Sequence, residues 1–416
     1  MPIAELSSLQ RVFVIGSFLR KDHPLFATRI RAAVKAGAKL SVLHGSNDEN
    51  LISTAHKIIA APSDWLAALT GVVAAVARAK GVAAPAGFEG AAVSAEAEAV
   101  AAALLAGEAG KAVFLGNAAA AHPQASALHA AAEWIAAQTG AKLGYLTEAA
   151  NTVGGYLVGA TAKHPAPAFS VPKKAYVLLH AEPELDAANP QAASAALQGA
   201  EMVVVMSAFK HGMDYADVLL PVAPFAETSG TFVNAEGRAQ SFNGTVKPAG
   251  ESRPAWKVLR VLGNILGLAG FDYDTSEAIR DELFEKGVTD LSAQLNNSAA
   301  RTPLAAAFGA GSQLERLAYV PIYFADALVR RSGPLLATAD AAAPLARLSA
   351  ATAAALGIQS GDKVQVTQGS GSAILQAAID AALPANVVRV AAAHVSTAAL
   401  GDMFGPITVA KAGEGK

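Results

Sequence analysis

The sequence predicts an α/β fold with doubly wound, mostly parallel sheets, followed by a small C-terminal β-barrel. Short apolar runs, typical of buried parallel strands, alternate with helical patterns as far as Leu266. From Leu335 onward apolar residues instead alternate with polar ones, which is the pattern of strands that face water on one side. These patterns predict three domains: two α/β stretches, residues 1–165 and 166–334, and a β-barrel over residues 335–416.

The first strand–helix–strand unit follows from two apolar runs and the helix between them. Arg11–Ile15 and Leu40–Leu43 are short apolar runs of the kind that is buried in a parallel sheet. Pro24 suits the first turn of the helix, and Gly37 suits its end. This order is that of a βαβ unit, whose two strands are parallel.

The same alternation continues along the chain. Further strands are predicted at Ala112–Leu115, Ala175–Leu179 and Met202–Met206. Helices are predicted near Asp64–Ala79, Ser94–Ala106, Pro123–Gln138, Pro190–Ala196, Pro254–Leu266 and Ser276–Lys286. Because helices that connect parallel strands pack on both faces of the sheet, we expect a doubly wound arrangement.

A different pattern begins in the C-terminal region. Ser349 is suited to cap a short helix that ends at Gly357. Alternating apolar and polar residues on both sides of Gly369–Gly371 predict a β-hairpin. Asn386–Val390 and Ile407–Val409 supply later strands, so this region is predicted to form a compact barrel.

The composition excludes several kinds of function. Charged residues make up 16% of the 416 residues and the formal net charge is −2, without the basic cluster that nucleic-acid binding requires. The chain contains no cysteine, so it forms no disulfide and cannot hold an iron–sulfur cluster through thiolates. The nine histidines are scattered, and no metal site is predicted. The longest apolar run, Trp65–Ala77, is too short to cross a bilayer.

Residues 216–240 form the most distinctive stretch, a strand followed by a loop dense in Gly, Ser, Thr, Asn and Glu. Pro221 stops the strand because proline has no N–H to donate to a sheet. Thr228–Thr231 and Asn234–Gly237 are turn clusters, and their glycines are expected in backbone conformations that strain a β-branched residue. Such a loop suits a phosphate or a tightly packed neighbouring domain, and a long surface connection has the same composition.

No catalytic residue is predicted. Glu227, Glu236 and Arg238 are the clustered charges of this loop, and a Glu–Arg pair that fixes the loop is their expected role. A general base needs a nucleophile or substrate beside it, and the sequence indicates no such partner. Ser229 lacks the G-x-S-x-G context of a nucleophilic serine.

Residues 216–240 resemble the signature near the end of the main domains of molybdopterin oxidoreductases. More specifically, the chain resembles the electron-transferring subunit of bacterial NADH:quinone oxidoreductase (respiratory complex I) that is related to this family, without its N-terminal iron–sulfur region. Further matching stretches occur in order at Arg11–Ser17, His23-Pro24, Leu40–Gly45, Glu148–Leu157 and Arg253–Leu262. They cover most of Arg11–Leu268, and the terminal domain that follows is similar to the double-psi barrel of that family.

The resemblance implies a pterin site that has lost its occupant. The vestigial pterin-site candidates are Gly16, Ser17, Thr228, Ser229, Gly230, Thr231 and Asn234. Pterin-binding relatives commonly have a small polar residue near the position of Phe18, and a phenyl ring replaces its hydrogen bonds poorly. We therefore expect no cofactor in this chain, with iron–sulfur clusters in the N-terminal region of the subunit or in partner subunits.

The implied function is a non-catalytic scaffold in a proton-translocating NADH dehydrogenase. The implied partners are the other hydrophilic-arm subunits of complex I and the cluster-bearing region of the same subunit, with no nucleic acid and no direct membrane span. The implied location is the cytoplasmic side of the inner membrane. Two alternatives remain. One is a pterin-dinucleotide-binding segment of a molybdenum oxidoreductase such as a formate dehydrogenase, and the other is a free-standing interaction or assembly module.

Overall fold

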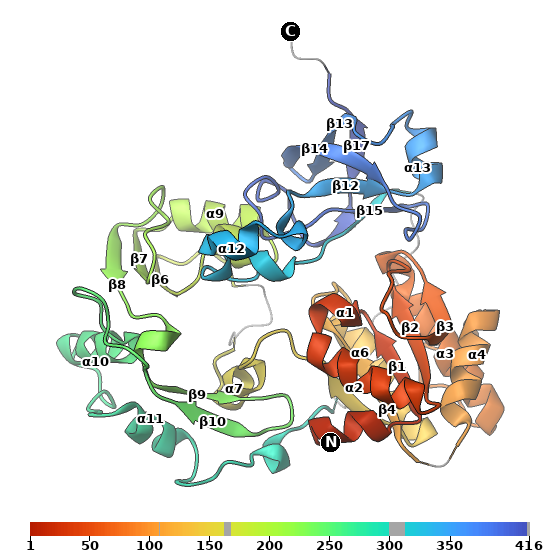
Figure 1. The fold of residues 1–416 in the computed structure, drawn as a ribbon, viewed down its shortest axis with the longest axis horizontal. Coiled ribbons are helices and arrows are strands. Elements are labelled where there is room, and N and C mark those ends of the chain that lie inside the picture. Colours follow the sequence, from red (N-terminus) through yellow and green to blue (C-terminus); the bar gives the residue numbers. More distant parts are fainter. Residues whose placement is uncertain (108, 162–167, 299–312, 414–416) are drawn as a thin grey trace. The chain divides into compact units, whose positions relative to one another are not determined.

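The computed structural model describes residues 1–107, 109–161, 168–298 and 313–413 (Figure 1). They form two compact units, of which the first contains Met1–Glu148, Asn296–Ile322 and Asp340–Lys416 and the second Ala149–Leu295 and Tyr323–Ala339. The predicted boundary between residues 165 and 166 lies outside the described residues, and the three-domain division stays a prediction. Among the described residues, no helix combines the length and the apolar character needed to cross a membrane.

A fully parallel five-stranded sheet forms the N-terminal part of the first unit. Its strands are β1 (Arg11–Ile15), β2 (Lys39–His44), β3 (Thr54–Ile59), β4 (Lys111–Leu115) and β5 (Lys142–Tyr145). In space they follow the order β3-β2-β1-β4-β5, so the chain builds one side of the sheet and then crosses to the other at β4. The order reverses between β1 and β4, and α/β proteins bind ligands at the carboxyl ends of strands near such a point.

Helices cover both faces of this sheet, as the sequence predicts (Figure 1). The helices on one face are η1 (Ile3–Ser8), α1 (Leu19–Asp22) and α2 (Pro24–Lys35). Those on the other are α3 (Trp65–Lys80), α4 (Ala95–Leu105) and α6 (Ala125–Thr139). Because both faces are buried, β4 is buried along its entire length and carries an uninterrupted apolar run after Lys111. The doubly wound α/β class is confirmed.

A curled seven-stranded sheet forms the C-terminal part of the first unit, in the order β16-β11-β15-β12-β14-β13-β17. Its strands are β11 (Glu315–Leu317), β12 (Leu345–Leu348), β13 (Lys363–Gln368), β14 (Gly371–Ile379), β15 (Val387–Arg389), β16 (Phe404–Pro406) and β17 (Thr408–Lys411). The predicted hairpin is confirmed, because β13 and β14 pair antiparallel across Gly369–Gly371. The cap is confirmed too: the Ser349 hydroxyl accepts a 3.2 Å hydrogen bond from the backbone N–H of Thr352 at the start of α13 (Ala350–Ala355).

The two sheets of the first unit share one apolar core. Leu317 of β11 and Phe404 of β16 belong to the same buried cluster as Trp65, the first residue of α3. The ring centroids of Trp65 and Phe404 are 6.3 Å apart. The carboxylate of Glu315 accepts a 3.0 Å hydrogen bond from the backbone N–H of Ser63, just before α3. These contacts hold β11 beside the carboxyl ends of the N-terminal strands.

The second unit is built around a three-stranded parallel sheet in the order β6-β7-β8. Its strands are β6 (Ala175–Leu179), β7 (Met202–Ser207) and β8 (Val218–Pro221), and a separate hairpin pairs β9 (Gly230–Val233) with β10 (Ala239–Phe242). The helices are α7 (Thr152–Leu157), α8 (Pro183–Asp186), α9 (Pro190–Gln198), α10 (Ala255–Ile265), α11 (Ser276–Leu283) and α12 (Gly333–Leu336). Residues 216–240 thus form β8, the β9 strand and the start of β10.

The two loop glycines are constrained in different ways. Gly237 has a φ of +88°, and a Cβ there would lie 2.7 Å from the backbone nitrogen of Ser292, so the predicted strain is confirmed. The prediction for Gly230 is wrong, because this residue lies in the extended strand β9. Its constraint is instead the ring of Phe242 on the paired strand, 2.7 Å from where its Cβ would stand.

The carboxylates of the loop within residues 216–240 form hydrogen bonds that hold turns of the second unit. The Glu236 carboxylate accepts a 3.0 Å hydrogen bond from Nε of Arg238, so the predicted pair is confirmed. Glu227 accepts a 3.0 Å hydrogen bond from the backbone N–H of Ala249. Each carboxylate therefore stabilises a turn of the second unit.

Candidate functional site

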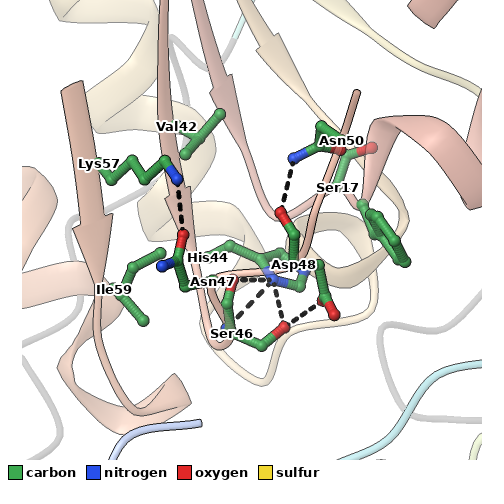
Figure 2. A pocket seen from close by; sticks show the side chains of 10 residues that line it. Ser17, Val42, His44, Ser46, Asn47, Asp48, Asn50, Lys57 and Ile59 are labelled. Carbon is green, nitrogen blue, oxygen red and sulfur yellow. Dashed lines mark hydrogen bonds between the residues drawn. The ribbon is translucent and has the colours of Figure 1, made fainter. Parts of the chain in front are cut away.

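A pocket opens at the carboxyl ends of β1, β2 and β3, beside the point where the strand order reverses (Figure 2). The empty space at the pocket, including open solvent at its mouth, is about 260 Å³. Its polar side chains are Ser17, His44, Ser46, Asn47, Asp48, Asn50 and Lys57, and its apolar walls are Phe18, Val42 and Ile59. The pocket therefore combines apolar walls with two hydroxyls, an imidazole, two amides, a carboxylate and an ammonium group.

The loop after β2 supplies most of these polar groups (Figure 2). The backbone N–H of Ser46 donates a 3.2 Å hydrogen bond to Nδ1 of His44, and the Ser46 hydroxyl donates to the carboxylate of Asp48. A Cβ on Gly45 would lie 2.8 Å from Cδ2 of Leu317, so the absence of a side chain lets the loop turn close to β11. These contacts fix the position of Asp48 at the rim of the pocket.

Asp48 is paired with Arg389 at the end of β15. Nη1 of Arg389 donates a 2.7 Å hydrogen bond to Oδ1 of Asp48, and the two side chains are 10% and 14% exposed, respectively. The guanidinium also lies 4.3 Å from the ring centroid of Tyr319 and 5.9 Å from that of Phe18. Burial by itself raises the pKa of Asp48, but the Arg389 charge and the Ser46 hydrogen bond outweigh it and hold that pKa below its usual value. The carboxylate is therefore ionised at neutral pH.

His44 and Lys57 differ in charge. Burial lowers the pKa of His44 to about 4, against the attraction of the nearby Asp48 carboxylate, so the ring is neutral at pH 7. Nζ of Lys57 donates a 2.8 Å hydrogen bond to the amide oxygen of Asn47, which keeps two further N–H groups available to a ligand.

The loop after β1 brings one predicted site residue to the pocket. Ser17 lines it, while Gly16 lies behind it with a φ of +66° and would place a Cβ 2.4 Å from the backbone nitrogen of Ala119. The backbone N–H of Phe18 donates a 2.8 Å hydrogen bond to the carboxylate of Asp22. Burial raises the pKa of Asp22 to about 6, although this hydrogen bond opposes the shift. An anion at this turn would have to compete with that carboxylate.

The other predicted site residues lie in the second unit, in or beside the β9–β10 hairpin: Thr228, Ser229, Gly230, Thr231 and Asn234. The hydroxyl groups of Ser229 and Ser276 are 2.6 Å apart, at the start of α11. The Asn234 side-chain oxygen accepts hydrogen bonds from the backbone of Glu236 and Arg238 at 3.1 and 2.9 Å. These bonds stabilise the hairpin, and a pterin-binding role for the five residues stays a prediction.

Apart from Ser17 and Phe18, sequence reasoning did not single out the residues that build the pocket. His44 ends the second strand of the first βαβ unit and Gly45–Asp48 follow it, and that position was a usable signal because it is the carboxyl edge of the sheet. Arg389 had no comparable signal, because its place beside Asp48 depends on how the C-terminal sheet packs. In the part of the chain that the structure describes, no three His, Asp or Glu side chains are grouped so as to hold a metal ion.

The chain belongs to the molybdopterin oxidoreductase family. The family described as molybdopterin oxidoreductase matches residues 1–265, and the one described as molydopterin dinucleotide binding domain matches residues 327–410. Asp48 lies in the first matched region and Arg389 in the second, so their hydrogen bond joins the two regions at the pocket.

Individual relatives match over short stretches. A Staphylococcus aureus protein that is named as a formate dehydrogenase is 38% identical to this chain over 90 residues. These residues are 21% of this chain and 9% of that protein. The mitochondrial 78 kDa subunit of NADH-ubiquinone oxidoreductase from Candida albicans is 40% identical over 74 residues, 18% of this chain and 10% of that subunit. The curated relatives are thus matched over a small part of their own length.

A solved structure with the same fold is the acetylene hydratase from Pelobacter acetylenicus. The alignment covers 99% of this chain and 81% of that chain, with a TM-score of 0.63 and 15% sequence identity. At that identity the likeness establishes the fold alone.

The prediction that this chain has no cofactor is wrong. Both matching families are defined by molybdopterin, and one by its dinucleotide, so the matches point to a molybdopterin cofactor. The chemistry of the pocket lining suits the nucleotide end of such a group, because its hydroxyl, amide, carboxylate and ammonium groups can bind ribose, base and phosphate.

Proposed function

We propose that this chain is the pterin-dinucleotide-binding segment of a molybdenum oxidoreductase such as a formate dehydrogenase. The observation that carries the proposal is the 2.7 Å hydrogen bond between Asp48 and Arg389, beside a pocket at the carboxyl edge of a doubly wound sheet. The 38% identity to the S. aureus formate dehydrogenase over 90 residues supports the choice of substrate class.

Each group of the pocket has a role in this proposal. Asp48 would accept hydrogen bonds from ribose hydroxyls or base N–H groups, because a carboxylate has acceptor sites beyond the two that Ser46 and Arg389 use. The ammonium of Lys57 would meet a phosphate. Phe18 and Ile59 would pack against the base.

In this proposal the chain binds and orients the cofactor. When bound, the cofactor supplies a molybdenum centre for two-electron redox chemistry. The chain has no cysteine and so offers no thiolate to the metal. Arg389 holds the Asp48 carboxylate in place, and neutral His44 adds no positive charge beside it.

The test is the pterin content of the full chain, produced in a host that makes the cofactor. Acid release followed by fluorescence of the oxidised pterin should give about one pterin per chain. Lys57→Met should lower the loading about tenfold, the worth of one charge-assisted phosphate contact. Lys39→Met is the matched control, because Lys39 is an exposed lysine at the opposite end of the same sheet. A chain that carries no pterin under these conditions contradicts the proposal.

The match to the Candida subunit favours a second candidate, a non-catalytic scaffold of NADH:quinone oxidoreductase. In that case the partners would be hydrophilic-arm subunits and the cluster-bearing region of the same subunit. Deletion of the gene separates the candidates. Loss of formate-dependent dye reduction supports the first, whereas loss of NADH:quinone reduction with intact formate oxidation supports the second.

A further inference from the structure

Three neighbouring strands of the N-terminal sheet, β2, β1 and β4, begin with a basic residue. Arg11 is paired with Lys39 on one side and with Lys111 on the other. Because paired residues point to the same face of a sheet, all three share the face of Phe13, which α3, α4 and α6 cover. Lys80, the last residue of α3, adds a fourth cation at this amino edge. These four cations, Arg11, Lys39, Lys80 and Lys111, form the basic rim.

The helices that end at this edge offset only part of the positive charge. Nζ of Lys80 donates to the carbonyl of Gln138, and Nζ of Lys111 donates a 3.1 Å hydrogen bond to the carbonyl of Thr139, at the C-terminus of α6. Since the C-terminus of a helix carries roughly half a negative charge, α3, α4 and α6 together supply about −1.5. The four cations of the basic rim therefore leave an excess of about two to three positive charges.

The excess charge has no counter-ion in the part of the chain that the structure describes. There, no Asp or Glu forms an ion pair with a member of the basic rim. Lys111 is 7% exposed, and burial lowers the pKa of its ammonium, which the charges of Arg11 and Lys80 lower further. Nε of Arg11 is buried without a hydrogen-bond partner. A buried cation without a counter-ion is costly, so the basic rim is suited to bind an anionic group.

The spacing of the basic rim fits the carboxylates on one face of a helix. Adjacent strands are about 4.8 Å apart, which sets the separation of Lys39 and Arg11 at the backbone. Side chains three or four positions apart on a helix are about 5–6 Å apart, whereas alternate side chains of an extended segment are about 7 Å apart. Three strands span about 10 Å, which is the diameter of one helix. Nucleic-acid binding commonly engages about six to ten phosphates, more than four cations can meet.

We propose that the basic rim binds an acidic helix of a partner protein, one with carboxylates three or four positions apart along one face. Lys39 and Lys80 are exposed and Arg11 is half-buried, so these three side chains can pair with carboxylates directly. Lys111 is buried and adds its charge without direct contact. The basic rim lies at the amino edge of the sheet and the pocket at the carboxyl edge, so the proposal does not depend on cofactor binding.

The first test treats the enzyme, isolated together with its partner proteins, with a carbodiimide, which joins a lysine to a carboxylate that it contacts. Mass spectrometry should find Lys39 and Lys80 joined to acidic residues of one partner protein, three or four positions apart. Lys173 and Lys247 are exposed lysines of the second unit and should give several-fold fewer such links. The proposal is overturned by an absence of links, or by links only to this chain's own carboxylates, among them Glu108, which lies outside the described residues.

A charge reversal separates binding from folding. Lys39→Glu with Lys80→Glu should lower the melting temperature of the full chain by only a few degrees, because both side chains are exposed. The probe is a synthetic helical peptide with glutamates at positions i, i+4 and i+7. Its affinity should fall about tenfold in this variant, through two lost ion pairs and the new repulsion. Lys173→Glu with Lys247→Glu is the matched control, because it makes the same change in net charge in the second unit.

A charge-swapped peptide completes the test. The same peptide with lysines in place of the glutamates should bind the Lys39→Glu, Lys80→Glu variant and not the wild type. Equal affinities of this variant and the control variant for the acidic peptide would contradict the proposal, as would a wild type that does not bind that peptide. Binding of phosphatidylserine vesicles or duplex DNA at least as tightly as the acidic peptide would rule out a protein helix as the preferred partner.

Discussion

Arg389 donates a 2.7 Å hydrogen bond to the carboxylate of Asp48 across 341 residues of sequence. The pair ties the end of β15 to the loop after β2, and the two side chains are 10% and 14% exposed. Because both charges are largely removed from water, each depends on the other for compensation.

Replacement of Arg389 by methionine should therefore destabilise the first unit. The expected loss is about 3 kcal/mol in the free energy of unfolding, because the Asp48 carboxylate is left without its main partner. The double variant Asp48→Asn with Arg389→Met should lose less, since no unpaired charge remains. Urea unfolding of the three proteins measures both quantities. A double variant less stable than Arg389→Met would contradict the electrostatic explanation.

Replacement of Arg316 should destabilise the protein at least as much as replacement of Arg389. It is 2% exposed, and its Nη1 donates to Gln368, to the carbonyl of Gly401 and to that of Asp402 at 3.0 to 3.1 Å. Arg316→Met should cost about 3–5 kcal/mol, because it strips several buried acceptors of their donor. Arg347→Met is the control on the same sheet and should cost less than about 1 kcal/mol, as is usual for a partly exposed position. Equal melting temperatures for the two variants would refute this assignment.

Two glycines of the second unit separate the effect of backbone conformation on stability from the effect of steric crowding. Gly237 and Gly250 both have positive φ, +88° and +56°, but only Gly237 has a neighbour within 4 Å of the Cβ position. Gly250→Ala should cost about 1 kcal/mol, from backbone strain alone. Gly237→Ala should cost about 1–3 kcal/mol more, since its Cβ would meet the backbone of Ser292. Thermal unfolding measures both, and equal losses would show that crowding has no effect.

His44 should make the stability depend on pH. Its pKa is about 4 in the folded chain, lowered by burial, and near 6.5 when unfolded, so the unfolded chain binds more protons between these values. The stability is complete above pH 6.5 and falls by about 3 kcal/mol as the pH drops towards 4. Asp22 acts with the opposite sign, because its pKa is raised to about 6 by burial.

The measurement is therefore the difference between the wild type and His44→Gln, in which the contribution of Asp22 cancels. Urea unfolding at pH 7.5 and pH 4.5 gives the free energy of unfolding of both proteins. The value for the wild type minus that for the variant should be smaller at pH 4.5 than at pH 7.5. A difference that is the same at both pH values would mean that His44 titrates normally.

The sequence was sufficient for the strands and helices whose signal is local. The apolar run Arg11–Ile15, the Pro24 start of α2 and the Ser349 cap all appear where the pattern predicts them. β11 was missed because Glu315–Leu317 is only three residues long and becomes a strand through pairing with β15 and β16. Such pairing is not encoded in local periodicity.

The candidate site was predicted only in part. Ser17 was named because it lies just after the first strand, where the carboxyl end of a strand is visible in sequence, and it lines the pocket. Asp48 and Arg389 were not predicted. The sequence does not show that these two residues form an ion pair, because the pair exists only once the two sheets have packed together. The expectation of no cofactor rested on the resemblance to the complex I subunit and on Phe18, and the matches to the two molybdopterin families overturn it.

The core shared by the two sheets sets the order in which the chain can mature on the ribosome. Trp65 packs in a cluster that includes Leu317 and Phe404, so the N-terminal sheet cannot bury this flank while only its own strands have been made. At the usual rates of synthesis, on the order of tens of seconds pass between the synthesis of Trp65 and that of Phe404. His44 and His122 can cover part of the indole ring early, and the side of the ring that meets Phe404 is covered only near the end of translation.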